Sequence, residues 1–385
     1  MSKAIENFRS EFFLDSPTHV PLNNAGISLL SRKCVAKLNE LSLQYATEGA
    51  FIGPFIEEWA QSKLILAKFL NAKGKEVAWT PNCSSAISFV ANGYEFLKGE
   101  EIVILENEYP SNFYPWVQRS KVMGSTLRIV KAEKDLSRSL EKVIQAINVN
   151  TRIVAVSHVQ SDCGYLMDIS ALSEAASKVG AIVVVDVIQS MGVLPLDFKT
   201  LGADVLCGGS HKWICGPAGA GILVVKEELL SKIAPCLHGA LNYGSFEDAP
   251  SLEKVPYADA RKFEQGTVSF HSILGCATAL SLLQEYSVDN LWIKAKSLRT
   301  LLENELKEMG FIVYGNPQAT GPQISLTYPR EKIQKFSEAL HKERISHALR
   351  PAPVEEGKVL RFSPHSYNTS DEINFALKTL KKVLN

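Results

Sequence analysis

The chain has 385 residues, of which 46% are hydrophobic and 21% charged, and this suits one large or two ordinary soluble domains. Lysine plus arginine and aspartate plus glutamate are both 41, and this balance gives no argument for a nucleic acid or an anionic membrane as partner. The seven cysteines are scattered and odd in number, which favours reduced thiols in the cytoplasm over a disulfide framework or a metal site.

The N-terminal part predicts an arm, a loop and two helices. Residues 1–16 alternate charged and apolar side chains, which indicates a short amphipathic helix or arm without the apolar core of a signal peptide. No run in the chain reaches the roughly 18 apolar residues of a membrane span. Residues 21–26 are rich in turn formers, and helices are expected at 31–47 and 55–70.

An anion site is predicted where the next strand meets a helix. Residues 77–80 form a short apolar strand, PNCSS at 81–85 is a polar turn, and residues 86–96 form an apolar helix. Free N–H groups and the helix dipole favour a phosphate at such a helix start, which points to Cys83 and Ser84. The alternative is that Ser84 only caps the helix.

Repeated strand–helix units follow. Short apolar runs at 102–105, 127–130 and 153–156 predict buried strands, and residues 169–179 predict a helix. Such units imply parallel strands joined by right-handed crossovers. In the loop after the third of these strands, His158 is expected to support the loop and not to act in catalysis.

Two further strands, at 182–185 and 205–207, carry the strongest chemical signal. The first ends on Asp186 and the second leads to Lys212, so parallel pairing would place both groups at the carboxyl edge of the sheet, where open α/β sheets bind ligands. The pair suits an aldehyde cofactor held as a Schiff base, with Lys212 as the amine and Asp186 beside a protonated ring nitrogen. Taken singly, such a lysine is usually a solvated surface residue, and such an aspartate is usually a helix cap.

The chain after this point predicts a smaller α+β region. The glycine-rich stretch 216–221 precedes a strand at 222–225 and does not open a helix, so it is not a dinucleotide-binding loop. Residues 237–256 are polar and irregular. Helices are expected at 272–286 and 288–309, and strands at 311–314 and 323–328.

Arg361 lies on an apolar strand, shortly before a helix that begins at Thr369 or Ser370. An unpaired charge is costly on such a strand, whereas a planar guanidinium there suits bidentate capture of a carboxylate. The alternative is a structural ion pair with an internal glutamate or aspartate.

Two stretches resemble a known family. DVIQS at 186–190 and SHKWICGPAGAGILVV at 210–225 are similar to sequences of the class V aminotransferases, pyridoxal-phosphate enzymes that include cysteine desulfurases, kynureninases and epimerase-like members. The resemblance covers nearly the whole chain and implies a fold-type I α/β structure with a mostly parallel, seven-stranded sheet. It places this large domain at 20–265 and a smaller α+β domain at 1–19 and 266–385.

The resemblance implies how the cofactor ring would be held. Lys212 would carry pyridoxal phosphate, and Asp186 would keep the ring nitrogen protonated. Gln189 and Ser161 would lie near the ring hydroxyl. Tyr109 stands where desulfurases have a stacking histidine, and its ring can pack face-on against the cofactor; without the resemblance it could be a core aromatic.

At the phosphate this chain departs from the family. Desulfurases often have a phosphate-binding serine where this chain has Gly209, so which hydroxyl meets the phosphate stays open. Thr267 lies in a family-like E-x-G-T and would reach the cofactor phosphate of the partner subunit, which implies a homodimer with shared sites. Without the resemblance, the Gly-Thr pair is only a turn. The other contacts expected near the cofactor are Cys83, Ser84, Ser210 and His211.

The substrate is expected to be an amino acid or keto acid whose α-carboxylate binds Arg361, with main chain at Ala25 and Gly26 also in contact. The leading prediction is an aminotransferase. A β-lyase or epimerase-like enzyme is the alternative, since these reactions share the same lysine and cofactor. A catalytically silent cofactor-binding scaffold is disfavoured because Lys212 is retained.

One departure bears on sulfur chemistry. Desulfurases carry a catalytic cysteine in a loop that corresponds to 346–358, and this chain has no cysteine after Cys276. A protein persulfide is therefore not expected, with Cys163 as the exception to test because its loop is expected to face the cofactor. In the same region Arg350 either binds a distal acidic group of the substrate or lies at the surface.

Overall fold

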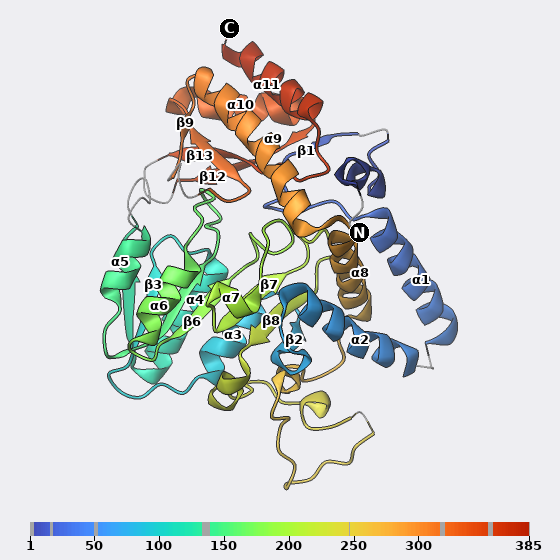
Figure 1. The fold of residues 1–385 in the computed structure, drawn as a ribbon, viewed down its shortest axis with the longest axis vertical. Coiled ribbons are helices and arrows are strands. Elements are labelled where there is room, and N and C mark those ends of the chain that lie inside the picture. Colours follow the sequence, from blue (N-terminus) through green and yellow to red (C-terminus); the bar gives the residue numbers. More distant parts are fainter. Residues whose placement is uncertain are drawn as a thin grey trace.

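We describe the protein from a computed structural model, which covers residues 4–15, 18–49, 53–132, 139–245, 247–315, 320–352 and 357–384. Figure 1 shows a large body built on one sheet and a smaller body, above it in this view, built on another. Over these residues, no helix has the length and apolar character needed to cross a membrane.

The larger sheet has seven strands in the order β2-β8-β7-β6-β5-β3-β4. Neighbouring strands are parallel except at β8, which runs antiparallel to β2 and β7. The prediction of a mostly parallel seven-stranded sheet is therefore confirmed. The strands are β2 (Val77–Thr80), β3 (Glu101–Leu105), β4 (Thr126–Val130), β5 (Thr151–Ser157), β6 (Ile182–Asp186), β7 (Val205–Gly209) and β8 (Gly221–Val225).

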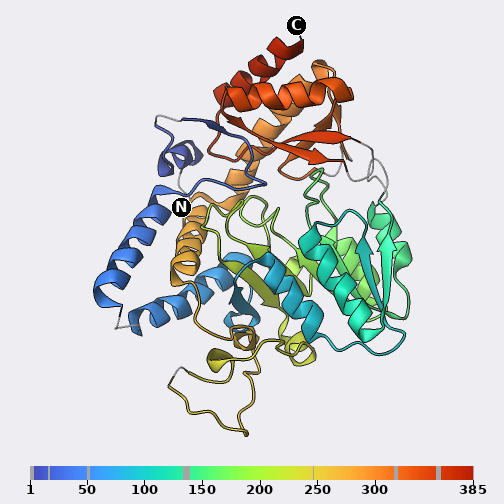
Figure 2. The same ribbon diagram turned by 180° about the vertical axis from the view of Figure 1, so that it is seen from behind.

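Helices cover both faces of this sheet. Alternate residues of a strand enter different cores: Val154 of β5 belongs to the core that contains α5, α6 and α8, and Ile153 belongs to the core that contains α3 and α4. The helices of the second core lie in front of the sheet in Figure 2. The helices named here are α3 (Cys83–Gly93), α4 (Pro110–Met123), α5 (Ser139–Ala146), α6 (Ile169–Ser177) and α8 (Phe270–Tyr286).

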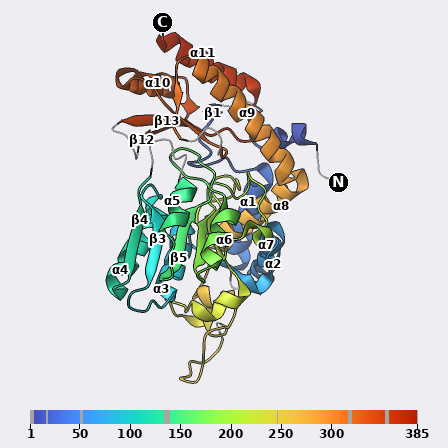
Figure 3. The same cartoon turned by 60° about the vertical axis from the view of Figure 1, so that its left-hand side comes forward.

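The smaller body is an antiparallel four-stranded sheet in the order β12-β13-β10-β9. Leu302, Phe336 and Leu377, from three different helices, pack in its core. Figure 3 shows the longest of these helices, α9, running from the large body to this sheet. The elements are β9 (Ile312–Val313), β10 (Ile324–Thr327), β12 (Ala348–Pro351), β13 (Lys358–Phe362), α9 (Val288–Glu308), α10 (Arg330–Lys342) and α11 (Ser370–Leu384).

The N-terminal segment contacts both bodies, since Phe8 and Phe12 pack in a core of the large sheet and Leu22 packs in the core of the smaller body. After a 3₁₀ helix at Ile5–Glu11, β1 (Val20–Pro21) pairs in parallel with β11 (Ile345–Ser346). The helices α1 (Arg32–Glu48) and α2 (Gly53–Leu70) then pack against α8. The expected division places α8, which begins after residue 265, in the smaller domain. However, Leu280 of α8 packs in a core of the large sheet. The domain division therefore stays a prediction.

Two element predictions need correction. The helix expected at 86–96 begins at Cys83, because the side chain of Asn82 accepts a hydrogen bond from Ser85 N and caps the helix there. The alternative in which Ser84 is only the cap is therefore wrong. The strand expected at 311–314 is shortened to Ile312–Val313, which pairs with only the end of β10.

Gly192 allows the turn after β6 to abut the segment that follows Lys212. Its φ is +99°, and a Cβ there would lie 2.6 Å from the main-chain oxygen of Trp213. The left-handed conformation and the close backbone approach both require glycine. A short helix, α7 (Phe198–Leu201), and β7 then complete this edge of the sheet.

We predict that Gly192→Ala lowers the free energy of unfolding by roughly 3 kcal/mol, the sum of left-handed backbone strain and overpacking. Gly180→Ala is the matched control, since Gly180 has a φ of +72° but no atom within 4 Å of a new Cβ. That control should lose only the strain, roughly 1 kcal/mol. Urea unfolding followed by circular dichroism measures both, and equal losses would contradict the packing argument.

Candidate active site

Lys212 and Asp186 meet at the carboxyl edge of two adjacent strands. Asp186 is the last residue of β6 and pairs in register with Cys207 of β7, and the chain leaving β7 leads directly to Lys212. Lys212 is only 9% exposed. Burial lowers its pKa to about 8; Asp186 opposes this effect, and the charge of Arg361 adds to it. A lysine with this pKa can serve as a nucleophile and as a proton carrier near neutral pH.

The carboxylate of Asp186 has one oxygen engaged and one available. Oδ1 accepts from Ile188 N at 2.9 Å and from Cys83 Sγ at 3.4 Å. Within the described part of the chain, no donor reaches Oδ2, although Asp186 is 3% exposed. Burial raises the pKa of Asp186, while the bond from Ile188 N and the charge of Lys212 oppose that rise. A carboxylate oxygen without a donor, on a residue that is largely buried, fits the protonated ring nitrogen of a pyridoxal cofactor.

Tyr109 provides a flat surface beside the lysine. It is the N-terminal cap residue of α4, where Pro110 starts the helix. Lys212 Nζ lies 5.6 Å from the centroid of its ring, and the ring is 37% exposed. The structure therefore does not bury Tyr109 in a core, and its ring can stack on a planar group next to Lys212.

The N-terminus of α3 offers donors to an anion. Asn82 occupies the N–H groups of Ser85 and Ala86, which leaves those of Cys83 and Ser84 without an acceptor among the described residues. Ser84 Oγ donates to Ser111 Oγ at 2.7 Å. Ser111 is a candidate that the sequence analysis missed, because no local motif links two residues 27 positions apart.

Ser210 is placed less favourably for a phosphate. Its hydroxyl donates to the main-chain oxygen of Pro217, and the residue is fully buried. The hydroxyl hydrogen is therefore already used within the segment that follows Lys212. His211 is half-buried, and burial together with the nearby charge of Lys212 lowers its pKa. Among the hydroxyl candidates, this geometry favours Ser84.

Gln189 joins the N-terminal arm to the lysine segment. Its Nε2 donates to Ala25 O at 3.0 Å, and its Oε1 accepts from Trp213 Nε1 at 3.0 Å. A carboxamide has a second N–H, which remains for a ring oxygen. The same hydrogen bond places main chain at Ala25 beside Gln189, and a contact of Ala25 and Gly26 with a substrate stays a prediction.

Arg361 reaches the site from β13 of the smaller sheet. Nη1 donates to Ser161 O at 2.6 Å and Nη2 to Asn23 Oδ1 at 3.4 Å, and the buried Nε has no partner. The side chain is 1% exposed and makes no ion pair with any described residue, contrary to the structural alternative. Burial, followed by the charge of Arg350, lowers its pKa to about 10. Ser161 thus contributes a carbonyl to Arg361, and a contact of its hydroxyl with the cofactor stays a prediction.

Thr267 lies apart from these residues. It is exposed and lines a hollow of about 140 Å³ together with Trp79 and Glu264. A role at the phosphate of a partner subunit, and the homodimer itself, stay predictions that light scattering of the holoenzyme would test.

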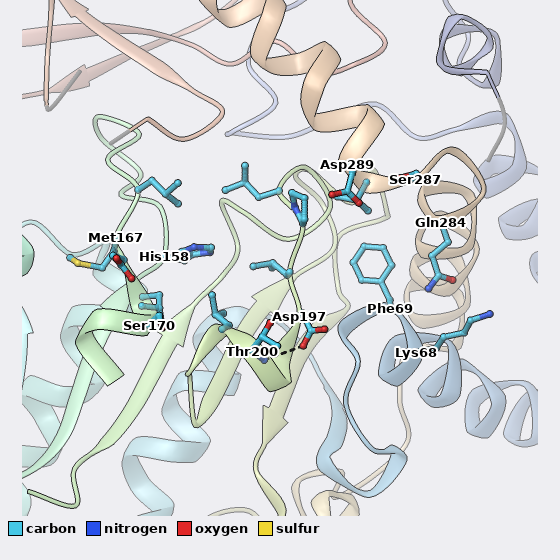
Figure 4. A pocket seen from close by; sticks show the side chains of 18 residues that line it. Lys68, Phe69, His158, Met167, Ser170, Asp197, Thr200, Gln284, Ser287 and Asp289 are labelled. Carbon is cyan, nitrogen blue, oxygen red and sulfur yellow. Dashed lines mark hydrogen bonds between the residues drawn. The ribbon is translucent and has the colours of Figure 1, made fainter. Parts of the chain in front are cut away.

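A hollow of about 1150 Å³ lies away from Lys212, and that residue is not part of its lining. Figure 4 shows His158, Asp197 and Asp289 around it. His158 Nδ1 lies 3.0 Å from Ser190 Oγ, and burial lowers the pKa of His158 to about 4. His158 is therefore neutral at physiological pH and tied to a neighbouring loop.

Cys163 is poorly suited to nucleophilic chemistry. It is buried, and burial raises the pKa of its thiol well above the usual value, with the charge of Asp162 adding to the effect. Its sulfur also accepts a hydrogen bond from Tyr165 N at 3.3 Å. Since the thiolate is the reactive form, this cysteine is held in the inert form. Residues 353–356 of the loop that lacks cysteine lie outside the described residues.

Comparisons with known proteins identify the family. The family model for aminotransferase class V matches residues 21–375. A probable cysteine desulfurase from Methanothermobacter thermautotrophicus is 29% identical over 331 residues, which span 83% of this chain and 82% of that protein.

Solved structures share the fold. Apo cysteine desulfurase from Thermococcus onnurineus NA1 has a TM-score of 0.91 at 23% identity, covering 100% of this chain and 99% of the other. A variant of C-DES with glycine covalently linked to its pyridoxal-phosphate cofactor has a TM-score of 0.88 at 21% identity, covering 97% and 98%.

We predict that capture of pyridoxal phosphate by the apo-protein depends on pH with a midpoint near 8 and not near 10.5. Only the neutral amine attacks an aldehyde, so the rate should rise as pH rises through the pKa of Lys212 and then level off. Asp186→Asn should move the midpoint down, because Asp186 raises that pKa. Stopped-flow absorbance measures the rate, and a rate still climbing at about pH 10 would show an ordinary lysine.

Proposed function

The chain belongs to the class V aminotransferase family, whose members use pyridoxal phosphate, and we propose from this that it is a carbon–sulfur lyase. In this proposal it removes a sulfur group from the β-carbon of an amino acid without forming a protein persulfide. The leading prediction from the sequence is an aminotransferase. Relatives described as probable cysteine desulfurases instead favour the alternative, cleavage at sulfur.

The observation that carries the proposal is a complete lysine site without a reactive thiol near it. Lys212 has a pKa of about 8 beside Asp186. Cys83, Cys163 and Cys207 are all buried, and burial raises the pKa of each thiol well above its usual value. A persulfide needs a thiolate at the substrate sulfur, whereas direct elimination needs only the lysine.

The residues of this chain would divide the work as follows. When bound, pyridoxal phosphate supplies an electron sink for negative charge at the substrate Cα. Arg361 binds the α-carboxylate through the second N–H of each of its outer nitrogens. Lys212, in its neutral form, takes the proton from Cα. Asp186 Oδ2 accepts a hydrogen bond from the ring nitrogen, and Tyr109 excludes water from one side.

The reaction balances without a redox partner. The C–S bond breaks, its electron pair leaves on sulfur, and the proton held by Lys212 passes to the sulfur group as a thiol. Water then releases the remaining three carbons as pyruvate together with ammonium. An S-substituted cysteine plus water therefore gives one thiol, one pyruvate and one ammonium.

We expect the holoenzyme to release pyruvate and thiol in equal amounts from S-methyl-L-cysteine, with its cofactor unchanged. Chromatography of the products and the cofactor absorbance measure this. Cys163→Ala should keep this activity and should also keep any sulfide release from cysteine, because that thiol takes no part. Accumulation of pyridoxamine phosphate would instead establish amino transfer, and sulfide release from cysteine that vanishes in Cys163→Ala would establish a persulfide route.

Asp186→Ala should lower kcat on the order of 100-fold or more while some cofactor remains bound, because a buried electrostatic partner of the developing charge is lost. Borohydride reduction and peptide mapping should still tag Lys212 in the variant. Asp168→Ala is the control, since that exposed carboxylate caps α6 and should leave kcat near the wild-type value. Wild-type turnover in Asp186→Ala would rule out the proposed role at the ring nitrogen.

A further inference from the structure

Arg350 and Arg361 project from the same face of the smaller sheet. In the pairing of β12 with β13, Ala348 is opposite Arg361 and Arg350 is opposite Val359. Residues two apart on a strand share a face, as do directly paired residues. Arg350 therefore lies on the face that carries Arg361 toward Lys212, one diagonal step along the hairpin.

The electrostatics agree with this placement. The positive charge of Arg350 lowers the pKa of Arg361 and also that of Lys212. Such effects decay with distance and solvent screening, so the guanidinium of Arg350 lies near both Arg361 and Lys212. A fully solvated surface arginine would not affect both groups.

Among the described residues, Arg350 has no counter-ion. It is half-buried and forms no hydrogen bond or ion pair with any described residue. Asp162, whose charge acts on Arg361, is buried with its Oδ1 unpaired, and burial raises its pKa. Neither Asp162 nor Asp186 forms an ion pair with Arg350 in the described structure, and the charge of Asp186 acts on Lys212.

One substrate carboxylate does not account for both arginines. Arg361 is anchored by Ser161 O and Asn23 and keeps a second N–H on each outer nitrogen, which suffices for an α-carboxylate. The donors of Arg350 remain available farther along the hairpin. A planar guanidinium is the side chain best suited to a second oxyanion.

We propose that Arg350 binds an anionic group at the distal end of the substrate side chain. Resting on the lyase function proposed above, this makes the substrate an S-substituted cysteine whose leaving group carries a carboxylate or another oxyacid. Arg361 holds the α-carboxylate, Arg350 holds the departing acid, and the scissile C–S bond lies between the two anchors.

The test compares two substrates that differ by one acidic group, S-carboxymethyl-L-cysteine and S-methyl-L-cysteine. Wild-type holoenzyme should have the higher kcat/KM for the acidic compound. In Arg350→Met the ratio of the two kcat/KM values should fall roughly 10- to 100-fold, the equivalent of one charged hydrogen-bonded contact. The loss should be mainly in KM, and Arg350→Lys should restore part of the ratio.

Lys358→Met is the matched control. Lys358 lies on β13 of the same hairpin, three residues from Arg361 and therefore on the opposite face. In the described part of the chain its side chain bonds to Gln334 alone. Removing this cation should leave the ratio unchanged. A ratio that is unchanged in Arg350→Met, or a wild type that does not prefer the acidic compound, would overturn the inference.

A binding measurement tests this inference independently of the lyase proposal. Calorimetric titration of the holoenzyme with succinate and with butyrate compares two ligands of equal length that differ by one carboxylate. Succinate should bind more tightly, and Arg350→Met should abolish the difference. If neither cysteine derivative is cleaved but this difference holds, the lyase function fails and the anion site stands. If wild type binds the two acids equally, the proposed anion site is wrong, whether or not cleavage occurs.

Discussion

The site depends on the register between two parallel strands, β6 and β7. Asp186 pairs with Cys207, so the chain that continues past β7 must turn at once over the carboxylate and present Lys212 to it. Because side chains alternate along a strand, a slip of one residue would turn Asp186 into the opposite core. The buried apolar residues on both faces oppose such a slip, and Gly192 lets the two following turns pack against each other without a gap.

Placing a lysine there has electrostatic consequences throughout the neighbourhood. Burial favours the neutral amine, and the arginine that reaches in from the smaller sheet favours it further. The negative charge of Asp186 limits this lowering of the pKa of Lys212 and offsets part of the positive charge around it. The remaining positive charge lies on the hairpin of β12 and β13, on the substrate side. The site is therefore arranged to attract anions while keeping its central amine reactive.

The sequence predicts the large sheet well, because strands buried on both faces are continuous apolar runs such as 182–185, and their carboxyl ends carry the chemistry. The sequence predicts the roles of individual polar side chains less well, because neighbouring residues of similar chemistry differ only in their three-dimensional positions. Asn82, Ser84 and Ser85 all lie in the turn after Pro81 and could each cap the helix, and only the structure makes Asn82 the cap. The direction of the Ser210 hydroxyl and the contact of Ser84 with Ser111 depend on distant chain segments. The short strand β12, half-buried and without a clear apolar alternation, has no sequence signal, so Arg350 could not be placed.

The arm that carries Ala25 has a consequence for the order of events in the cell. Ala25 N bonds to Ser363 Oγ and Asn24 N to Ser363 O, and the first pair is 338 positions apart. During synthesis, domains begin to fold while later residues are still being added. Residues 20–26 therefore leave the ribosome well before Ser363 is made. Until then this segment lacks that partner, so the carboxylate-binding half of the site can be completed only after the segment that carries Arg361 and Ser363 has been synthesised.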